Sequence, residues 1–179
     1  MKAYVCSIGE PTTKIVCNQL KKFGFEVVLY GEVEPWHKKY ERFIFEAREN
    51  CIRIDADVVP NINVKVFMTY EAGMKQARTY DMYKNDVGVT SPVFYSKGIL
   101  KEIRDNWDKI GVSRPETDAS RLPSVNPFLY TSDIIVGIHG IYQRQEDIDR
   151  HQKHKVLRKQ ITDYDFELIN QLQDIWRKD

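Results

Sequence analysis

The sequence has 179 residues, of which 42% are hydrophobic and 30% are charged, as in an ordinary globular domain. Its 27 Lys and Arg residues nearly balance its 26 Asp and Glu residues, so we expect no nucleic-acid partner. No run approaches 18 apolar residues, so we expect no transmembrane helix. Three cysteines, an odd number, predict reduced core residues of a cytoplasmic protein. The length fits one domain, 1–179.

The first 60 residues alternate between predicted strands and helices. We expect strands over Lys2–Ile8, Phe25–Tyr30 and Cys51–Ile54, with helices that begin near Thr12 and at Pro35. Gly24 follows the first helix, at the position where glycine commonly ends one. The second helix carries an apolar face made of Trp36, Tyr40, Phe43 and Ala47. This order of elements predicts a βαβαβ unit with a parallel sheet, and therefore an α/β fold.

The second half of the sequence is less regular. We expect strands over Val64–Tyr70, Val87–Tyr95 and Ile134–Ile138, a helix over Ser96–Trp107, and irregular chain over 111–132. The polar segment Glu71–Tyr83 fits a loop or a helix. From Gln143 we expect a very polar helical stretch, followed by a last helix that begins at Thr162 and carries an apolar stripe.

Two aspartates, Asp55 and Asp57, follow the third predicted strand. Because side chains alternate along a strand, we expect both carboxylates on the same side. Two carboxylates about 4 Å apart repel by about 4 kcal/mol at an effective dielectric of 20. Hydrogen bonds could relieve this repulsion, and so could one divalent cation, since Mg²⁺ sites often combine one or two carboxylates with substrate phosphates. Pro60 is expected to end the strand, which puts the pair where ligands bind in open α/β sheets. Aspartates that only cap a turn are the alternative.

Several segments together resemble one known family. Ile54–Pro60, with Asp55-Ala56-Asp57, is similar to the metal-binding DXD motif of nucleotide-sugar-dependent glycosyltransferases of the GT-A fold. Ser7–Thr12 occupies the turn where this family embraces the nucleoside, and Ala47–Asn50 resembles its helix end that faces the sugar nucleotide. Val89–Tyr95 resembles its acceptor-side strand. The resemblance implies a Rossmann-like nucleotide-sugar-binding half, 1–60, and a compact acceptor half with C-terminal helices, 61–179, around a mixed central sheet.

The resemblance also implies roles for individual residues. The implied ligands of a Mn²⁺ or Mg²⁺ cofactor are Asp57, Asp55 and His139, and an imidazole suits Mn²⁺ better than Mg²⁺. The implied donor-binding residues are Ser7, Ile8, Glu10, Thr12, Arg48 and Asp55. Asp118 and Glu116 are the implied catalytic bases, because an inverting transferase needs a carboxylate to accept the proton of the acceptor hydroxyl. A histidine packed in a turn, and carboxylates on a solvated turn after Pro115, are the alternatives.

The function that the resemblance implies is a metal-dependent glycosyltransferase of the hexosyltransferase type. It would move a sugar from a UDP- or GDP-linked donor to a hydroxyl acceptor such as a glycan. A sugar-nucleotidyltransferase is the nearest alternative, but such enzymes normally have a glycine-rich, basic loop after the first strand. Here that turn, Gly9–Thr13, has one glycine and no arginine. A non-catalytic nucleotide-sugar or glycan-binding module, cut from a longer chain, is a third interpretation.

Overall fold

The computed structural model describes residues 1–7, 9–10, 12–32, 35–82 and 86–140. Ile8, one of the expected donor-binding residues, and the expected helices after Gln143 and Thr162 lie outside the described residues. Within the described ranges, no helix is long and apolar enough to cross a membrane. Cys6, Cys17 and Cys51 are free thiols, as predicted.

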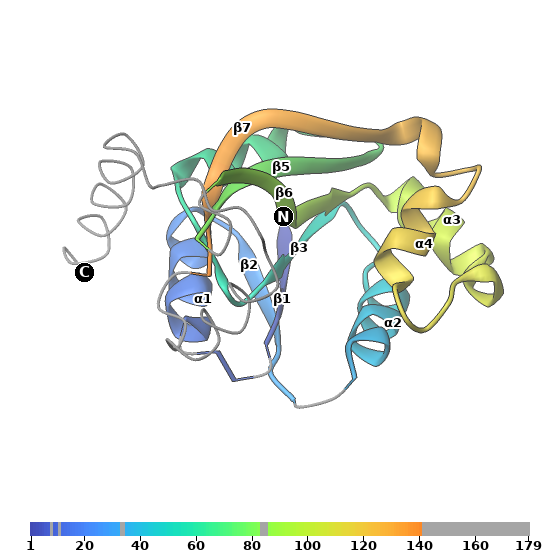
Figure 1. Ribbon diagram of the computed structural model, residues 1–179, viewed down its shortest axis with the longest axis horizontal. Helices are drawn as coiled ribbons and strands as arrows, with labels where there is room; N and C mark the ends of the chain where they lie inside the picture. Colours follow the sequence, from blue (N-terminus) through green and yellow to red (C-terminus); the bar gives the residue numbers. More distant parts are fainter. Residues whose placement is uncertain (8, 11, 33–34, 83–85, 141–179) are drawn as a thin grey trace.

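The first half forms the predicted βαβαβ unit. Strands β1 (Lys2–Cys6), β2 (Glu26–Tyr30) and β3 (Cys51–Asp55) are parallel, with β1 in the middle. Helices α1 (Thr13–Lys22) and α2 (Trp36–Glu46) cover opposite faces of these strands (Figure 1). The alternation along β1 explains this arrangement, because Val5 belongs to the core cluster under α1 and Tyr4 to the cluster under α2. Gly24 follows α1 with a φ of +92°, as expected of a glycine that ends a helix.

The second half extends the same sheet with strands of mixed direction. These are β4 (Val58–Pro60), β5 (Met74–Asp81), β6 (Asp86–Tyr95) and β7 (Leu129–His139). The order across the seven-stranded sheet is β2-β1-β3-β6-β5-β7-β4, with β6 antiparallel to β3 and β7 parallel to β5. Strands β3 and β4 are almost consecutive in the chain, yet β4 lies at the far edge. The sheet therefore curls, with β7 arching over β5 and β6 (Figure 1).

The remaining elements are helical. They are α3 (Lys97–Asp105), α4 (Pro115–Arg121) and the 3-10 helices η1 (Ile62–Thr69), η2 (Trp107–Lys109) and η3 (Asn126–Phe128). Helices α3 and α4 contribute to the same core cluster as α2 and lie on its side of the sheet (Figure 1). The chain expected to be irregular over 111–132 therefore contains a short helix, α4, which starts at Pro115.

Two predictions between residues 60 and 83 are wrong. The expected strand Val64–Tyr70 is the 3-10 helix η1, whose buried residues Val64 and Phe67 are three positions apart, the period of that helix. Asn61 begins it by accepting a hydrogen bond from the amide of Asn63. The segment Glu71–Tyr83, expected to be loop or helix, contains strand β5, which lies inside the sheet between β6 and β7.

Pro60 ends a strand, as predicted, but that strand is β4 and not β3, which already ends at Asp55. It lies in β4, opposite Gly137 of β7. A proline is tolerated there because β4 is an edge strand, on which a residue can lack an N–H without losing a partner. Gly137 is required by the close approach of the two strands, since a Cβ at this position would lie 2.4 Å from the carbonyl oxygen of Val59.

Candidate functional site

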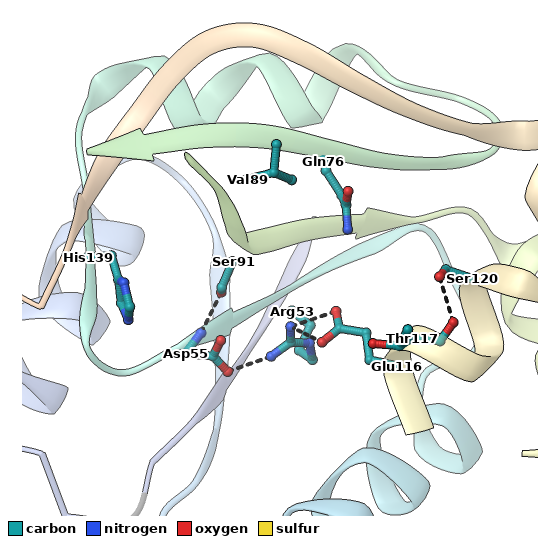
Figure 2. Close-up of a pocket in the computed structure, with 9 residues that line it drawn as sticks. All are labelled: Arg53, Asp55, Gln76, Val89, Ser91, Glu116, Thr117, Ser120 and His139. Carbon is teal, nitrogen blue, oxygen red and sulfur yellow. Dashed lines mark hydrogen bonds and ion pairs between the residues drawn. The ribbon is translucent and has the colours of Figure 1, made fainter. Parts of the chain in front are cut away.

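Two cavities meet at the carboxyl ends of the parallel strands. The first, which we call the α4 cavity, has a volume of about 370 Å³ and is lined by Arg53, Asp55, Gln76, Val89, Ser91, Glu116, Thr117, Ser120 and His139 (Figure 2). The second, the α2 cavity, has a volume of about 260 Å³ and is lined by Cys6, Glu10, Trp36, Lys39, Asp55, Asp57 and His139. Asp55 and His139 line both cavities. Ligands bind at this edge of open α/β sheets.

Arg53 is the centre of the charged residues in the α4 cavity. Its side chain is 2% exposed. One guanidinium nitrogen, Nη1, donates to Asp55 Oδ1 at 2.5 Å, and Nη2 donates to both oxygens of Glu116 at 2.7 and 2.8 Å (Figure 2). The ring of Trp36 lies 4.8 Å from the guanidinium carbon. One cation thus joins a carboxylate at the end of β3 to a carboxylate on α4.

Burial and charge have opposite effects on this group. Burial alone would lower the pKa of Arg53, but Asp55 and Glu116 raise it well above its ordinary range. Burial raises the pKa of Asp55, and the charge of Arg53 opposes that rise. No role for Arg53 was predicted from the sequence. The signal was present, because an arginine inside an otherwise apolar, buried strand must find partners.

Glu116 is oriented by three hydrogen bonds. Besides the two from Arg53, its Oε1 accepts one from the hydroxyl of Tyr95 at 3.0 Å. A carboxylate offers about four acceptor positions, two on each oxygen. Oε1 uses two and Oε2 uses one, so Oε2 keeps an acceptor position on a side chain that lines the α4 cavity.

Asp118 does not share this site. Its Oδ2 accepts a hydrogen bond from the amide of Gly111 at 3.1 Å, and it does not line either cavity. Residues two positions apart on an α-helix are separated by about 200° around its axis. The side chains of Glu116 and Asp118 therefore leave α4 in nearly opposite directions. Thr117 and Ser120, by contrast, line the α4 cavity together with Glu116. Of the two residues expected to serve as the catalytic base, the structure therefore brings Glu116 to the α4 cavity and leaves Asp118 outside it.

Asp55 and Asp57 do not share one side of a strand, contrary to the prediction. Strand β3 ends at Asp55 and the chain turns through Ala56 and Asp57. Asp57 Oδ2 instead lies 3.1 Å from His139 Nε2 at the end of β7. The other ring nitrogen of His139, Nδ1, lies 3.5 Å from Oδ1 of the buried Asp81 on β5.

His139 lies between two carboxylates, and its pKa follows from that position. Burial alone would lower the pKa of His139, but the neighbouring carboxylates of Asp57 and Asp81 raise it to about 9. The imidazole is therefore protonated at neutral pH. His139 was predicted from the sequence, but Asp81 was not, because it lies in a segment whose sequence shows no strand pattern.

The turn after β1 holds the other expected donor-binding residues in place. Ser7, 2% exposed, donates from its hydroxyl to Glu10 Oε2 at 2.6 Å. Glu10 lines the α2 cavity. Thr12 is fully buried, and its hydroxyl donates to the carbonyl of Ala56 at 2.5 Å. Thr12 thus binds the turn formed by Ala56 and Asp57 to the start of α1 and does not line the α2 cavity. It was expected to contact the donor directly, and in this structure it supports the turn instead.

Arg48 is not brought to the site. It is exposed and lies just before β3, whereas Asp55 is the last residue of that strand. Because a strand rises about 3.3 Å per residue, the length of β3 separates the two. Arg48 and Asp55 therefore lie at opposite ends of β3, and Arg48 lines neither the α4 cavity nor the α2 cavity.

The residues expected to bind a metal suit a site that a substrate completes, and not a site in which the protein supplies every ligand. In the part of the chain that the structure describes, no three His, Cys, Asp or Glu side chains are grouped as a metal-binding set. Asp55, Asp57 and His139 nevertheless line the same α2 cavity. Mg²⁺ is usually bound through one or two carboxylates together with substrate phosphates. The two aspartates fit that kind of site.

Comparisons with known proteins support the fold. No protein-family model and no curated protein sequence matches the chain. Among the solved structures that resemble it is a protein from STIV, with 14% identity over 74% of this chain and 82% of that chain and a TM-score of 0.52. Two others are 4-diphosphocytidyl-2C-methyl-D-erythritol synthase from Anaerococcus prevotii (8% identity, 86% of this chain and 94% of that chain, TM-score 0.51) and a hypothetical transferase from Thermus thermophilus (9%, 82% and 99%, TM-score 0.50). The chain has a Rossmann-like, GT-A-like α/β fold. The fold class predicted from the sequence is confirmed.

Proposed function

We propose that this protein is a nucleotide-sugar-dependent glycosyltransferase that binds its donor in the α2 cavity and its acceptor in the α4 cavity. The observation that carries the proposal is that these two cavities share Asp55 and His139. Group transfer between two substrates requires adjacent sites whose reacting atoms meet, and a shared wall provides this. The names of two structures with the same fold, a transferase and a diphosphocytidyl-methylerythritol synthase, are consistent with transfer chemistry.

The donor side is formed by the β1–α1 turn, α2 and the turn of Asp57. A UDP- or GDP-linked sugar is the donor that the sequence resemblance favours. Asp57 and Asp55 would hold Mn²⁺ or Mg²⁺, with His139 as a further candidate ligand once it has given up its proton. The bound ion would act as a Lewis acid on the diphosphate leaving group.

The acceptor side is formed by β3, β5, β6 and α4. Its lining includes the polar, uncharged side chains of Gln76, Ser91, Thr117 and Ser120, which suit a hydroxyl-rich acceptor. Glu116 is the base in this proposal: its Oε2 takes the proton of the attacking hydroxyl, and α4 and Arg53 hold the carboxylate in place. Because Arg53 also binds Asp55, the same guanidinium aligns the acceptor-side and donor-side carboxylates.

The charges of the α4 cavity disfavour the sugar-nucleotidyltransferase alternative. Such an enzyme would have to bind a sugar phosphate, which needs cationic side chains. Among the described residues that line this cavity, Arg53 and His139 are the cations. Arg53 binds two carboxylates and His139 lies between two others, so neither charge is left for a phosphate.

Asp57→Asn tests the donor side of the proposal. We expect the substitution to weaken binding of UDP or GDP at least about tenfold in Mn²⁺, that is by about 1.4 kcal/mol, because it removes a carboxylate ligand of the ion. Binding in EDTA should stay within about twofold of the parent value. Isothermal titration calorimetry of both proteins, with and without Mn²⁺, measures these affinities.

Asp118→Asn is the matched control, because it removes an aspartate that lines neither cavity. It should leave the Mn²⁺-dependent gain in affinity intact. If the Asp57→Asn protein keeps the full gain that Mn²⁺ gives the parent, the assignment of Asp57 to the metal is wrong.

A further inference from the structure

Lys39 is a buried cation whose partners among the described residues are two backbone carbonyls and no carboxylate. Among the described residues, two cationic side chains are buried, Arg53 and Lys39, which are 2% and 1% exposed. Arg53 forms ion pairs with Asp55 and Glu116. Lys39 on α2 instead donates from Nζ to the carbonyl of Ser7 and lies 3.5 Å from the carbonyl oxygen of Tyr30. The two buried cations are therefore compensated very differently.

A purely structural role does not account for this lysine. Ser7 follows strand β1, and Tyr30 is the last residue of the neighbouring parallel strand β2. The amide of Ser7 already donates a hydrogen bond to the carbonyl of Tyr30 at 2.9 Å. The strand ends are thus joined without Lys39. Removing an ammonium group from water carries a large desolvation cost, which neutral carbonyls offset less well than an anion does. An apolar residue would fill the same position without that cost.

The position of Lys39 indicates what kind of group it can bind. Its side chain lines the α2 cavity. Within the described residues, no carboxylate lies within ion-pair distance of its ammonium group. An ammonium group has three donor hydrogens, and the two carbonyls use at most two of them. The other cation in the described lining, His139, is held between Asp57 and Asp81. Lys39 is therefore the described cation of this cavity that can still bind an anion.

We propose that Lys39 binds the phosphate groups of the ligand in the α2 cavity, which makes this cavity a diphosphate subsite with a protein cation of its own. The inference rests on the proposed function and adds to it that part of the diphosphate affinity is independent of a metal ion. Lysine is a common phosphate-binding residue, acting as a compact point charge. Glu10, Asp55 and Asp57 line the same cavity and would otherwise repel a diphosphate.

Lys39→Gln tests this inference, because glutamine keeps a hydrogen-bond donor for the carbonyl of Ser7 and removes the charge. In EDTA, we expect the variant to bind inorganic pyrophosphate, UDP and GDP at least about tenfold more weakly than the parent. Its affinity for uridine and guanosine, which carry no phosphate, should stay within about twofold. Calorimetry gives these affinities. Lys14→Gln is the control: Lys14 is exposed on α1, outside the α2 cavity, and its loss should change none of them.

The outcomes separate the inference from the proposed function. If Lys39→Gln binds pyrophosphate as the parent does, or loses nucleosides and pyrophosphate equally, Lys39 does not bind phosphate. If the parent binds pyrophosphate through Lys39 but binds no nucleoside diphosphate, the inference stands and the proposed function fails. A parent that binds neither overturns both. Should the variant not fold, parent crystals soaked in pyrophosphate must show its density about 3 Å from Nζ of Lys39, and density elsewhere would refute the subsite.

Discussion

Arg53→Met is expected to lower the free energy of unfolding by about 3–5 kcal/mol at pH 7, the usual result of breaking a buried ion pair from one side. The substitution keeps much of the length of the side chain but leaves Asp55 and Glu116 without their shared cation. The two carboxylates, whose side chains are 37% and 25% exposed, would then repel each other without a cation between them. Urea unfolding followed by circular dichroism measures the change.

The loss should depend on pH in a defined direction. Burial already raises the pKa of Asp55 and the charge of Arg53 opposes this, so the variant's folded-state pKa rises further above the unfolded value of about 3.9. A carboxyl group whose pKa is higher in the folded state than in the unfolded state destabilises the fold. The full destabilisation applies at pH values above the folded-state pKa, and it disappears as the pH falls toward the unfolded-state pKa. The difference from the parent should therefore shrink between pH 7 and pH 4.

Arg42→Met is the control for this prediction. Arg42 forms its ion pairs with Glu32 and Glu46 near the surface, where such pairs contribute about 0–1 kcal/mol. If Arg53→Met costs no more than Arg42→Met, Arg53 does not organise the site as we describe.

Glu116→Gln is expected to lower the rate of sugar transfer by about 10² to 10⁴, the usual contribution of a general base. Donor affinity should change little, because Glu116 lines the α4 cavity and not the α2 cavity. The amide oxygen of glutamine can still accept a hydrogen bond from Arg53, which also retains Asp55, so the fold should persist. Steady-state kinetics and donor calorimetry on the same preparations separate the two effects.

Asp118→Asn provides the matched comparison, with a carboxylate removed from the same helix on its other side. We expect transfer within about twofold of the parent rate, because Asp118 binds the amide of Gly111. A larger loss in Asp118→Asn than in Glu116→Gln would assign the base to Asp118.

The first half of the fold could be predicted because its signals are local. Gly24, Pro35 and the apolar spacing of α2 gave the helices, and short apolar runs gave the parallel strands. Strand β5 could not be recognised, because it carries Gln76 toward one cavity and Asp81 toward His139. Polar residues that serve a site resemble those of a loop when only the sequence is known.

The composition of the site shows the same limit. His139 and the aspartates could be chosen because each follows an apolar strand. The pair of Arg53 and Glu116 spans 63 residues, and no local pattern indicates such a contact. Glu116 could not be preferred over Asp118, because the segment was expected to be irregular. Without a predicted helix, there was no basis for deciding which of the two side chains faces the cavity. The curl of the sheet, which brings Asp57 to His139 across 82 residues, is likewise a tertiary property.

Incubation with nucleotide sugars tests the central claim most directly. The protein, Mn²⁺, a panel of UDP- and GDP-linked sugars and a mixture of neutral sugar acceptors would be analysed together by mass spectrometry. We predict a free nucleoside diphosphate and an acceptor whose mass has risen by one sugar residue, with both signals strongly reduced in Glu116→Gln. Consumption of a nucleoside triphosphate and a sugar phosphate with release of pyrophosphate, and no sugar transfer, would contradict it.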